Sequence, residues 1–193
     1  MNDMEIRGNQ IIDACLIEKS TSPYEIFVDI AEHDFVRMHG PEHHILDGAC
    51  ILTACHNAGL DFDLMAALAE LMQRGLQMPG AMCGMWGVCG AVASIGAALS
   101  ILESTGPLTT NDSWGSHMAY TSKALEKLSV MGGPRCCKRD AYTAMETAVD
   151  YINQRYGIHL QKDDITCGFY PQNAQCKKEG CPYYPLAKTN HLN

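Results

Sequence analysis

Apolar residues recur at helical spacing along most of the chain, and the alternation typical of half-buried strands is nearly lacking. The sequence therefore predicts an all-α fold, a single-domain bundle of about six or seven helices over residues 1–193. An irregular, ligand-organised tail is expected at 160–193. We expect helices over residues 4–17, 23–30, 42–58, 62–73, 88–102, 114–130 and 140–156.

Residues with capping preferences bound several of these helices. Pro23 suits a first helical turn, and Asp61 is the expected N-cap of the fourth helix. Gly59 and Gly157 follow helices as C-terminal caps, because glycine readily adopts the left-handed conformation needed there. Beyond His159, glycines and prolines interrupt every periodic run, which predicts the irregular tail.

The net charge and the lengths of the apolar runs argue against nucleic acid and membranes as partners. The formal net charge of −8 argues against a phosphate-binding surface, so nucleic acid is not expected. The apolar run 88–102 is shorter than the roughly 20 residues of a membrane span, and the acidic residues near Met1 do not suit a secretory signal. We expect a cytoplasmic protein with a small-molecule or redox partner, no membrane contact, and a homodimer as one option.

Ten cysteines in such a chain indicate thiols or metal ligands rather than disulfides. Cys15, Cys50 and Cys55 lie within helical patterns and fit a buried apolar role. The others lie where the pattern is irregular, and these are the candidate metal ligands: Cys83, Cys89, Cys136, Cys137, Cys167, Cys176 and Cys181.

The tail holds three of them in the spacing Cys167-x8-Cys176-x4-Cys181, followed by Pro182. Metal ligation would order a segment with little apolar content of its own. A cysteine followed by proline also occurs at cluster-ligand positions in ferredoxins. The favoured interpretation is an iron–sulfur cluster, [4Fe–4S] above all, and the alternatives are a structural zinc site or unligated thiols.

The motif GGPRCCKRD begins a predicted helix and places three cations beside two thiols. The helix dipole and the cations favour a thiolate or another anion, although an ordinary basic helix start is the alternative. Side chains of adjacent cysteines diverge, so only one of the pair is expected as a ligand. Arg135 is a catalytic candidate, and Lys138 and Arg139 are cofactor-binding candidates.

The motif CGMWGVCG resembles a glycine-lined loop that enters a helix N-terminus, where a cluster or thiolate is favoured. Its alternative is a tight crossing of two helices, for which small residues also serve. Three glycines are cofactor-binding candidates here: Gly84, Gly87 and Gly90.

The motif HGPEHH gathers three imidazoles and a carboxylate at a loop-to-helix junction, which indicates acid–base or metal chemistry. Adjacent helical residues point apart, so at most one of His43 and His44 is expected to join His39 in one site. Asp47 lies one turn later and can orient an imidazole. Polar residues at a helix start are the alternative; the catalytic candidates are His39, Glu42, His43 and His44.

These four motifs, in their order along the chain from HGPEHH to the tail cysteines, resemble an uncharacterised domain-of-unknown-function family of anaerobic bacteria and archaea, over nearly the whole chain. A looser resemblance covers Gly48 to Leu102, where Cys50, Gly59 and the run VCGAV are similar to the redox-active C_GCAxxG_C_C proteins. That second resemblance implies a cysteine-based redox or cluster role.

The leading hypothesis is an iron–sulfur enzyme of anaerobic sulfur or one-carbon metabolism that uses an open cluster site. A non-catalytic electron-transfer subunit and a zinc-stabilised interaction domain are the alternatives. Cys89, Cys167, Cys176 and Cys181 form the preferred ligand set, followed by Cys83 and one of the adjacent pair.

Overall fold

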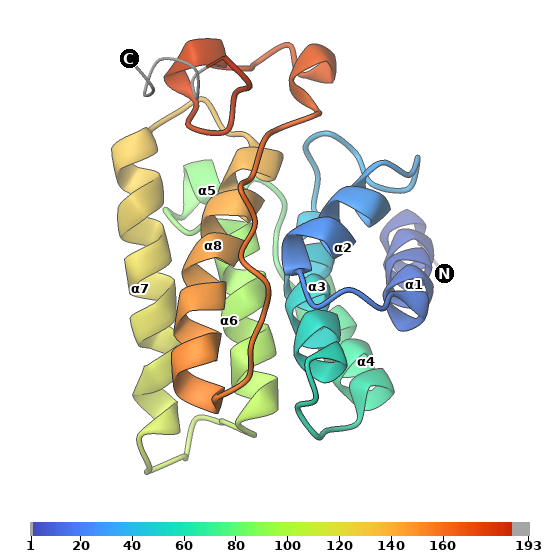
Figure 1. Ribbon diagram of the computed structural model, residues 1–193, viewed down its shortest axis with the longest axis vertical. Helices are drawn as coiled ribbons and strands as arrows, with labels where there is room; N and C mark the ends of the chain where they lie inside the picture. Colours follow the sequence, from blue (N-terminus) through green and yellow to red (C-terminus); the bar gives the residue numbers. More distant parts are fainter. Residues whose placement is uncertain (1, 187–193) are drawn as a thin grey trace.

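The computed structural model describes residues 2–186, and within that range the chain is helical with no strand (Figure 1). The predicted all-α class is confirmed, and the helices form a single compact domain. Two short 3-10 turns, η1 (Tyr170–Gln172) and η2 (Lys178–Gly180), lie in the tail. The α-helices are α1 (Asp3–Ile17), α2 (Pro23–Ala31), α3 (His43–Asn57), α4 (Leu64–Leu76), α5 (Met82–Met85), α6 (Gly90–Leu102), α7 (Ser113–Met131) and α8 (Cys137–Tyr156).

Helix boundaries follow local capping, and the largest differences from the expected positions lie at both ends of α4 and at the start of α8. α2 has proline in its first turn as predicted, and Gly157 ends α8 at φ +65°. The expected N-cap at Asp61 is wrong, because the Asp63 carboxylate accepts the Ala66 backbone N–H at 3.0 Å and α4 begins after it. α8 begins one turn earlier than expected, so that Cys136 becomes its N-cap.

α3 is the central helix and packs most extensively against α6. Gly48 allows the close approach, since a Cβ at this position would lie 2.5 Å from the backbone oxygen of Ser94 on α6. The Gly48 backbone N–H also donates to the Ser94 hydroxyl at 2.9 Å. Buried aliphatic and aromatic side chains from the long helices complete a single core, in which Cys15, Cys50 and Cys55 are fully buried as expected.

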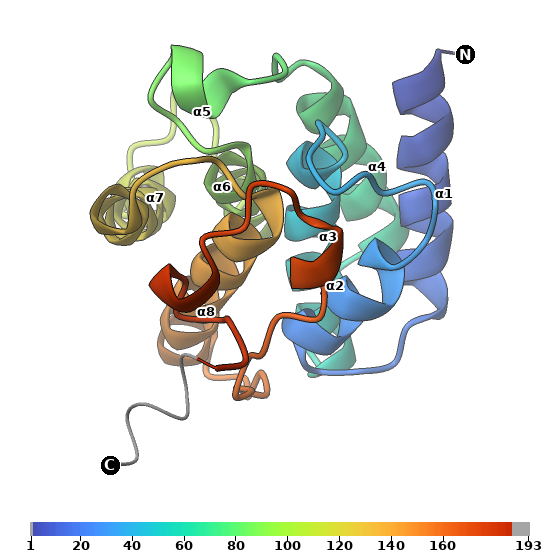
Figure 2. The ribbon, with the colours of Figure 1, turned by 90° about the horizontal axis from the view of Figure 1, so that it is seen from above.

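The tail runs back along α8 and then crosses one end of the bundle (Figures 1 and 2). It is better anchored than its sequence suggested: Leu160, Ile165, Phe169 and Tyr183 are buried. The expected shortage of apolar content concerned residues 167–181, and within them the buried apolar side chains are those of Phe169 and Cys181. Between Phe169 and Cys181, however, the chain is largely exposed, and the predicted residues 187–193 of the tail lie outside the described range.

None of the described helices has both the length and the apolar character needed to cross a bilayer. The elements that matter for chemistry are the starts of α3, α6 and α8, which lie toward the same end of the bundle as the tail and the α5 segment.

Candidate metal centre

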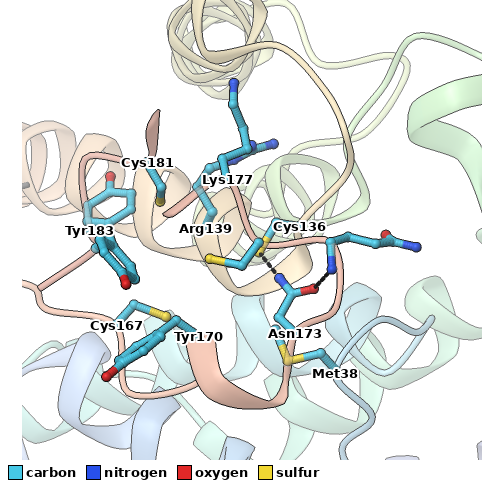
Figure 3. A pocket seen from close by; sticks show the side chains of 12 residues that line it. Met38, Cys136, Arg139, Cys167, Tyr170, Asn173, Lys177, Cys181 and Tyr183 are labelled. Atoms are coloured by element: carbon cyan, nitrogen blue, oxygen red, sulfur yellow. Dashed lines mark hydrogen bonds between the residues drawn. The ribbon is translucent and has the colours of Figure 1, made fainter. Parts of the chain in front are cut away.

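Four thiols from distant parts of the chain border one pocket at the tail-covered end of the bundle, which we call the thiol pocket. Cys136 comes from the start of α8, and Cys167, Cys176 and Cys181 come from the tail. Figure 3 shows the labelled side chains of Cys136, Cys167 and Cys181 around it. The structure thus places Cys136, rather than Cys89, with the three tail cysteines.

The four thiols interact with one another electrostatically. Burial is the main reason that the pKa values of Cys136, Cys167 and Cys181 are raised. Negative charge on a neighbouring thiol raises each of these pKa values further, with Cys176 acting on both Cys167 and Cys181. In the metal-free chain these three groups therefore favour the protonated form, and a metal must displace protons to bind them.

Polar hydrogens face the sulfur atoms. The Asn173 side-chain amide donates to Cys136 Sγ at 3.4 Å (Figure 3), and the Lys178 backbone N–H donates to Cys176 Sγ at 3.3 Å. Backbone N–H groups of Arg139, Phe169 and Tyr183 lower the pKa values of Cys136, Cys167 and Cys181, respectively, in partial opposition to burial. Such donors stabilise thiolates over thiols.

Arg139 adds a positive charge to the thiol pocket. Its side chain is almost fully buried and pairs with Asp140 at 2.9 Å, while a second hydrogen bond runs to the Pro134 carbonyl. The remaining Nη1 has no hydrogen-bonding partner among the described residues. A buried, incompletely satisfied guanidinium is costly unless an anionic group shares its site.

A second cavity, of about 280 Å³, lies on the other side of the first turn of α8, and we call it the histidine cavity. His39, His43 and His44 all border it, which differs from the expectation that at most one of the adjacent pair would join His39. Their side chains do diverge, but the cavity extends around the start of α3 and meets both. Its other chemically reactive lining residues are Cys83, Cys89, Arg135, Cys137 and Asp140.

The adjacent cysteines separate as the sequence predicted. Cys136 borders the thiol pocket, and Cys137 borders the histidine cavity. Burial raises the pKa of Cys137 to about 12, and it likewise raises that of Cys89 to about 12, with Asp140 contributing at Cys89. One turn of α8 therefore contributes one thiol to each site.

A buried polar chain supports this end of the bundle. His43 Nδ1 lies 3.1 Å from Asp47 Oδ1, as predicted for an orienting carboxylate, and His43 Nε2 lies 3.4 Å from Lys138 Nζ. Burial lowers the pKa of Lys138, whose amine lies over the Phe27 and Phe169 rings. Lys138 thus contacts both the core, through Phe27, and the tail, through Phe169. The contact with Phe169 could not be predicted from the sequence.

Four predicted site residues lie outside these two cavities, and the buried Lys138 described above is one of them. Glu42 is fully buried, and its Oε1 pairs with Arg37 and Arg7. Gly84 and Gly87 border an open groove of about 580 Å³ that adjoins the histidine cavity. Gly90 does border the histidine cavity, and a Cβ there would lie 2.2 Å from the His44 ring, so this glycine serves close packing.

Sequence reasoning missed Asn173, which joins the two sites. Its side-chain oxygen lies 3.2 Å from His39 Nε2, and its amide donates to Cys136 Sγ. The sequence feature that could have identified Asn173 is its position between Cys167 and Cys176.

A family model matches residues 11–184 of the chain, and its description is a family of unknown function, DUF5714. The chain belongs to this family. No curated protein and no solved structure matches the chain. The membership agrees with the resemblance to an uncharacterised family and attaches no activity to it, so the function has to be argued from the two cavities.

Proposed function

We propose that this DUF5714 member is an iron–sulfur redox protein whose cluster is bound by Cys136, Cys167, Cys176 and Cys181. The observation that carries the proposal is the convergence of these four thiols, from two distant segments, on one pocket. A bound cluster of this kind supplies one-electron transfer, with a potential that depends on hydrogen bonds to sulfur, net charge and burial.

The residues around the thiols suit such a group. Donors from Asn173 and Lys178 face two of the sulfurs, and Arg139, whose buried Nη1 has no hydrogen-bonding partner among the described residues, borders the pocket with its positive charge. Four protein thiols also satisfy every iron of a [4Fe–4S] cluster. This favours an electron-carrying cluster over the open-site enzyme that the sequence suggested first.

Zinc bound by the same four thiols is the alternative to a cluster. Zinc bound by tetrahedral thiolates needs sulfur atoms roughly 3.8 Å apart, given its bond lengths. Within residues 2–186, no three potential ligands are grouped closely enough to hold a single metal ion. A cluster separates its thiolates more widely, because iron and sulfide atoms lie between them.

The test is purification without air, followed by iron and acid-labile sulfide analysis and visible and EPR spectroscopy. We expect iron and sulfide in equal amounts. Cys136→Ser should lose most of the iron, whereas the adjacent Cys137→Ser should retain it, because its thiol borders the other cavity. The proposal would be overturned if the protein stays free of iron after anaerobic reconstitution, or if it contains zinc in place of iron. Equal losses of iron in the two variants would overturn it as well.

A further inference from the structure

The side chain of Asn173 connects the two segments that supply the four thiols. Asn173 is buried in the turn that carries Cys176, whose backbone N–H donates to the Asn173 carbonyl at 3.0 Å. Its side-chain oxygen accepts the Gln175 backbone N–H at 2.9 Å, and its side-chain nitrogen lies 3.4 Å from Cys136 Sγ at the start of α8 (Figure 3). One buried amide therefore contacts the tail and α8 together.

The groups around Asn173 fix which way its amide faces. The Gln175 backbone N–H can only donate, so the Asn173 atom that faces it is the oxygen. His39 Nε2 lies 3.2 Å from the same oxygen. Burial lowers the pKa of His39, so its imidazole is neutral near pH 7 and has one N–H, which is on Nε2. His39 Nδ1, buried without a hydrogen-bonding partner among the described residues, then carries a lone pair.

Two donors on the oxygen leave the Asn173 N–H groups to face the sulfur. Turning the amide over would place its N–H groups against the N–H groups of His39 and Gln175 and would leave no donor for Cys136. The N–H that faces Cys136 Sγ is thus held in place before any charge develops on the sulfur, and it needs no reorientation when that charge appears.

The direction of this hydrogen bond decides which redox state it favours. Reduction adds one electron to an iron–sulfur cluster and makes its sulfur atoms more negative, and hydrogen bonds to sulfur are among the determinants of the potential. A donor stabilises the more negative state more strongly. An N–H directed at a ligand sulfur therefore raises the midpoint potential of the cluster.

We propose that Asn173, oriented by His39 and the Gln175 backbone, raises the midpoint potential of the cluster through Cys136 Sγ. This inference rests on the proposed function, because it requires a cluster bound by Cys136. His39 acts through Asn173 and is therefore a positioning residue, whereas the sequence had indicated it as a catalytic candidate.

Anaerobic redox titration with dithionite as the electron donor, followed by EPR, tests the role of Asn173. Asn173→Ala removes the donor and should reduce the preference for the added electron about tenfold, which lowers the midpoint potential by ~59 mV. Asn173→Asp also places a carboxylate oxygen near the sulfur, so its midpoint potential should be lower still. Gln172→Glu is the matched control, because it adds the same charge at the exposed neighbouring position and keeps the amide.

Two His39 variants test the orientation of the amide. His39→Phe removes the N–H and should lower the midpoint potential by less than Asn173→Ala does, since the Gln175 N–H still faces the oxygen. His39→Gln keeps an N–H near the position of Nε2 and should restore the wild-type value. Both variants retain the four thiols and Asn173, so they decide the proposal even if the Asn173 variants lose their iron.

A wild-type midpoint potential in Asn173→Ala, or equal shifts in Gln172→Glu and Asn173→Asp, would overturn the role of Asn173. If the Asn173 variants bind no iron, a wild-type potential in His39→Phe would overturn it instead. Equal, lowered potentials in His39→Phe and His39→Gln would overturn the orientation by the His39 N–H alone. Wild-type protein without iron would overturn the proposed function and this inference with it, and iron analysis shows that outcome before any potential is measured.

Discussion

Cys55 lies in the buried core near the C-terminal end of α3, whereas Cys136 lies at the tail-covered end of the bundle, and the two thiols have different surroundings. Burial alone raises the pKa of Cys55 to about 12. Burial also raises the pKa of Cys136, but the backbone N–H and guanidinium of Arg139 oppose it. The comparison teaches that the cysteines of one chain differ in their surroundings: donors and positive charge, which stabilise a thiolate, surround Cys136 and not Cys55.

The largest expected effect is on the tail. Removing the proposed cluster with an oxidant and a chelator should raise amide hydrogen exchange across 170–182 by on the order of 100-fold, because metal–thiolate bonds contribute directly to local folding. Exchange in α3 and α6 should not change. Segments near Phe169 and Tyr183 should respond less, because both side chains are buried against the bundle. Unaltered exchange in 170–182 would mean that the thiols do not order the tail.

The helices of the bundle were predictable because each is specified by residues that are close together in the sequence. Helical periodicity and capping residues gave every long helix to within about one turn, and errors such as Asp61 for Asp63 arose where two equivalent caps lie two residues apart. The grouping of the cysteines, in contrast, depends on contacts between segments that are distant in the sequence. Choosing Cys136 over Cys89 depends on which face of α8 the tail crosses, and no spacing rule contains that information.

The histidine cavity was predicted only in its parts. The motifs around His39, Cys83 and Arg135 each indicated chemistry, but their union in one cavity depends on the shared orientation of α3, α6 and α8. The pairing of His43 with Asp47 was predictable, because residues four apart on a helix are neighbours.

Gly48→Ala separates core packing from the metal centre. The added Cβ would meet the Ser94 backbone oxygen at 2.5 Å, so α3 and α6 must move apart at a cost of about 1–3 kcal/mol in the free energy of unfolding. Chemical denaturation should show this loss, with iron content unchanged. Gly84→Ala is the matched control, since its Cβ would enter open space. Equal stability of the two variants would contradict the close packing.

A smaller effect concerns pH. Burial, followed by the charge of Lys138, lowers the pKa of His43 well below its ordinary value. The unfolded chain therefore binds a proton near pH 6.5 that the folded chain does not, and folding stability falls as pH decreases below that value. The slope is at most about 1.4 kcal/mol per pH unit for one histidine.

His43→Gln should reduce this slope in denaturation curves measured between pH 7 and 5, even if the variant is less stable at every pH. His56→Gln, an exposed position on the same helix, is the control. Asp47 contacts the His43 ring and titrates with a raised pKa of its own, so both slopes are also measured in an Asp47→Asn background. Identical slopes for wild type and His43→Gln would show that His43 is protonated in the folded protein.

The smallest effect is expected from Cys55→Ala. Removing one buried sulfur should lower the free energy of unfolding by ~1 kcal/mol, comparable with deleting one methylene from a core. Iron content and the visible spectrum should stay at wild-type values, because Cys55 lies in the apolar core and contributes nothing to either cavity. Cys55 is the best single choice, since Cys15 and Cys50 interact with each other and their substitutions would not be independent. Loss of iron from Cys55→Ala would erase the distinction between the core thiols and those of the thiol pocket.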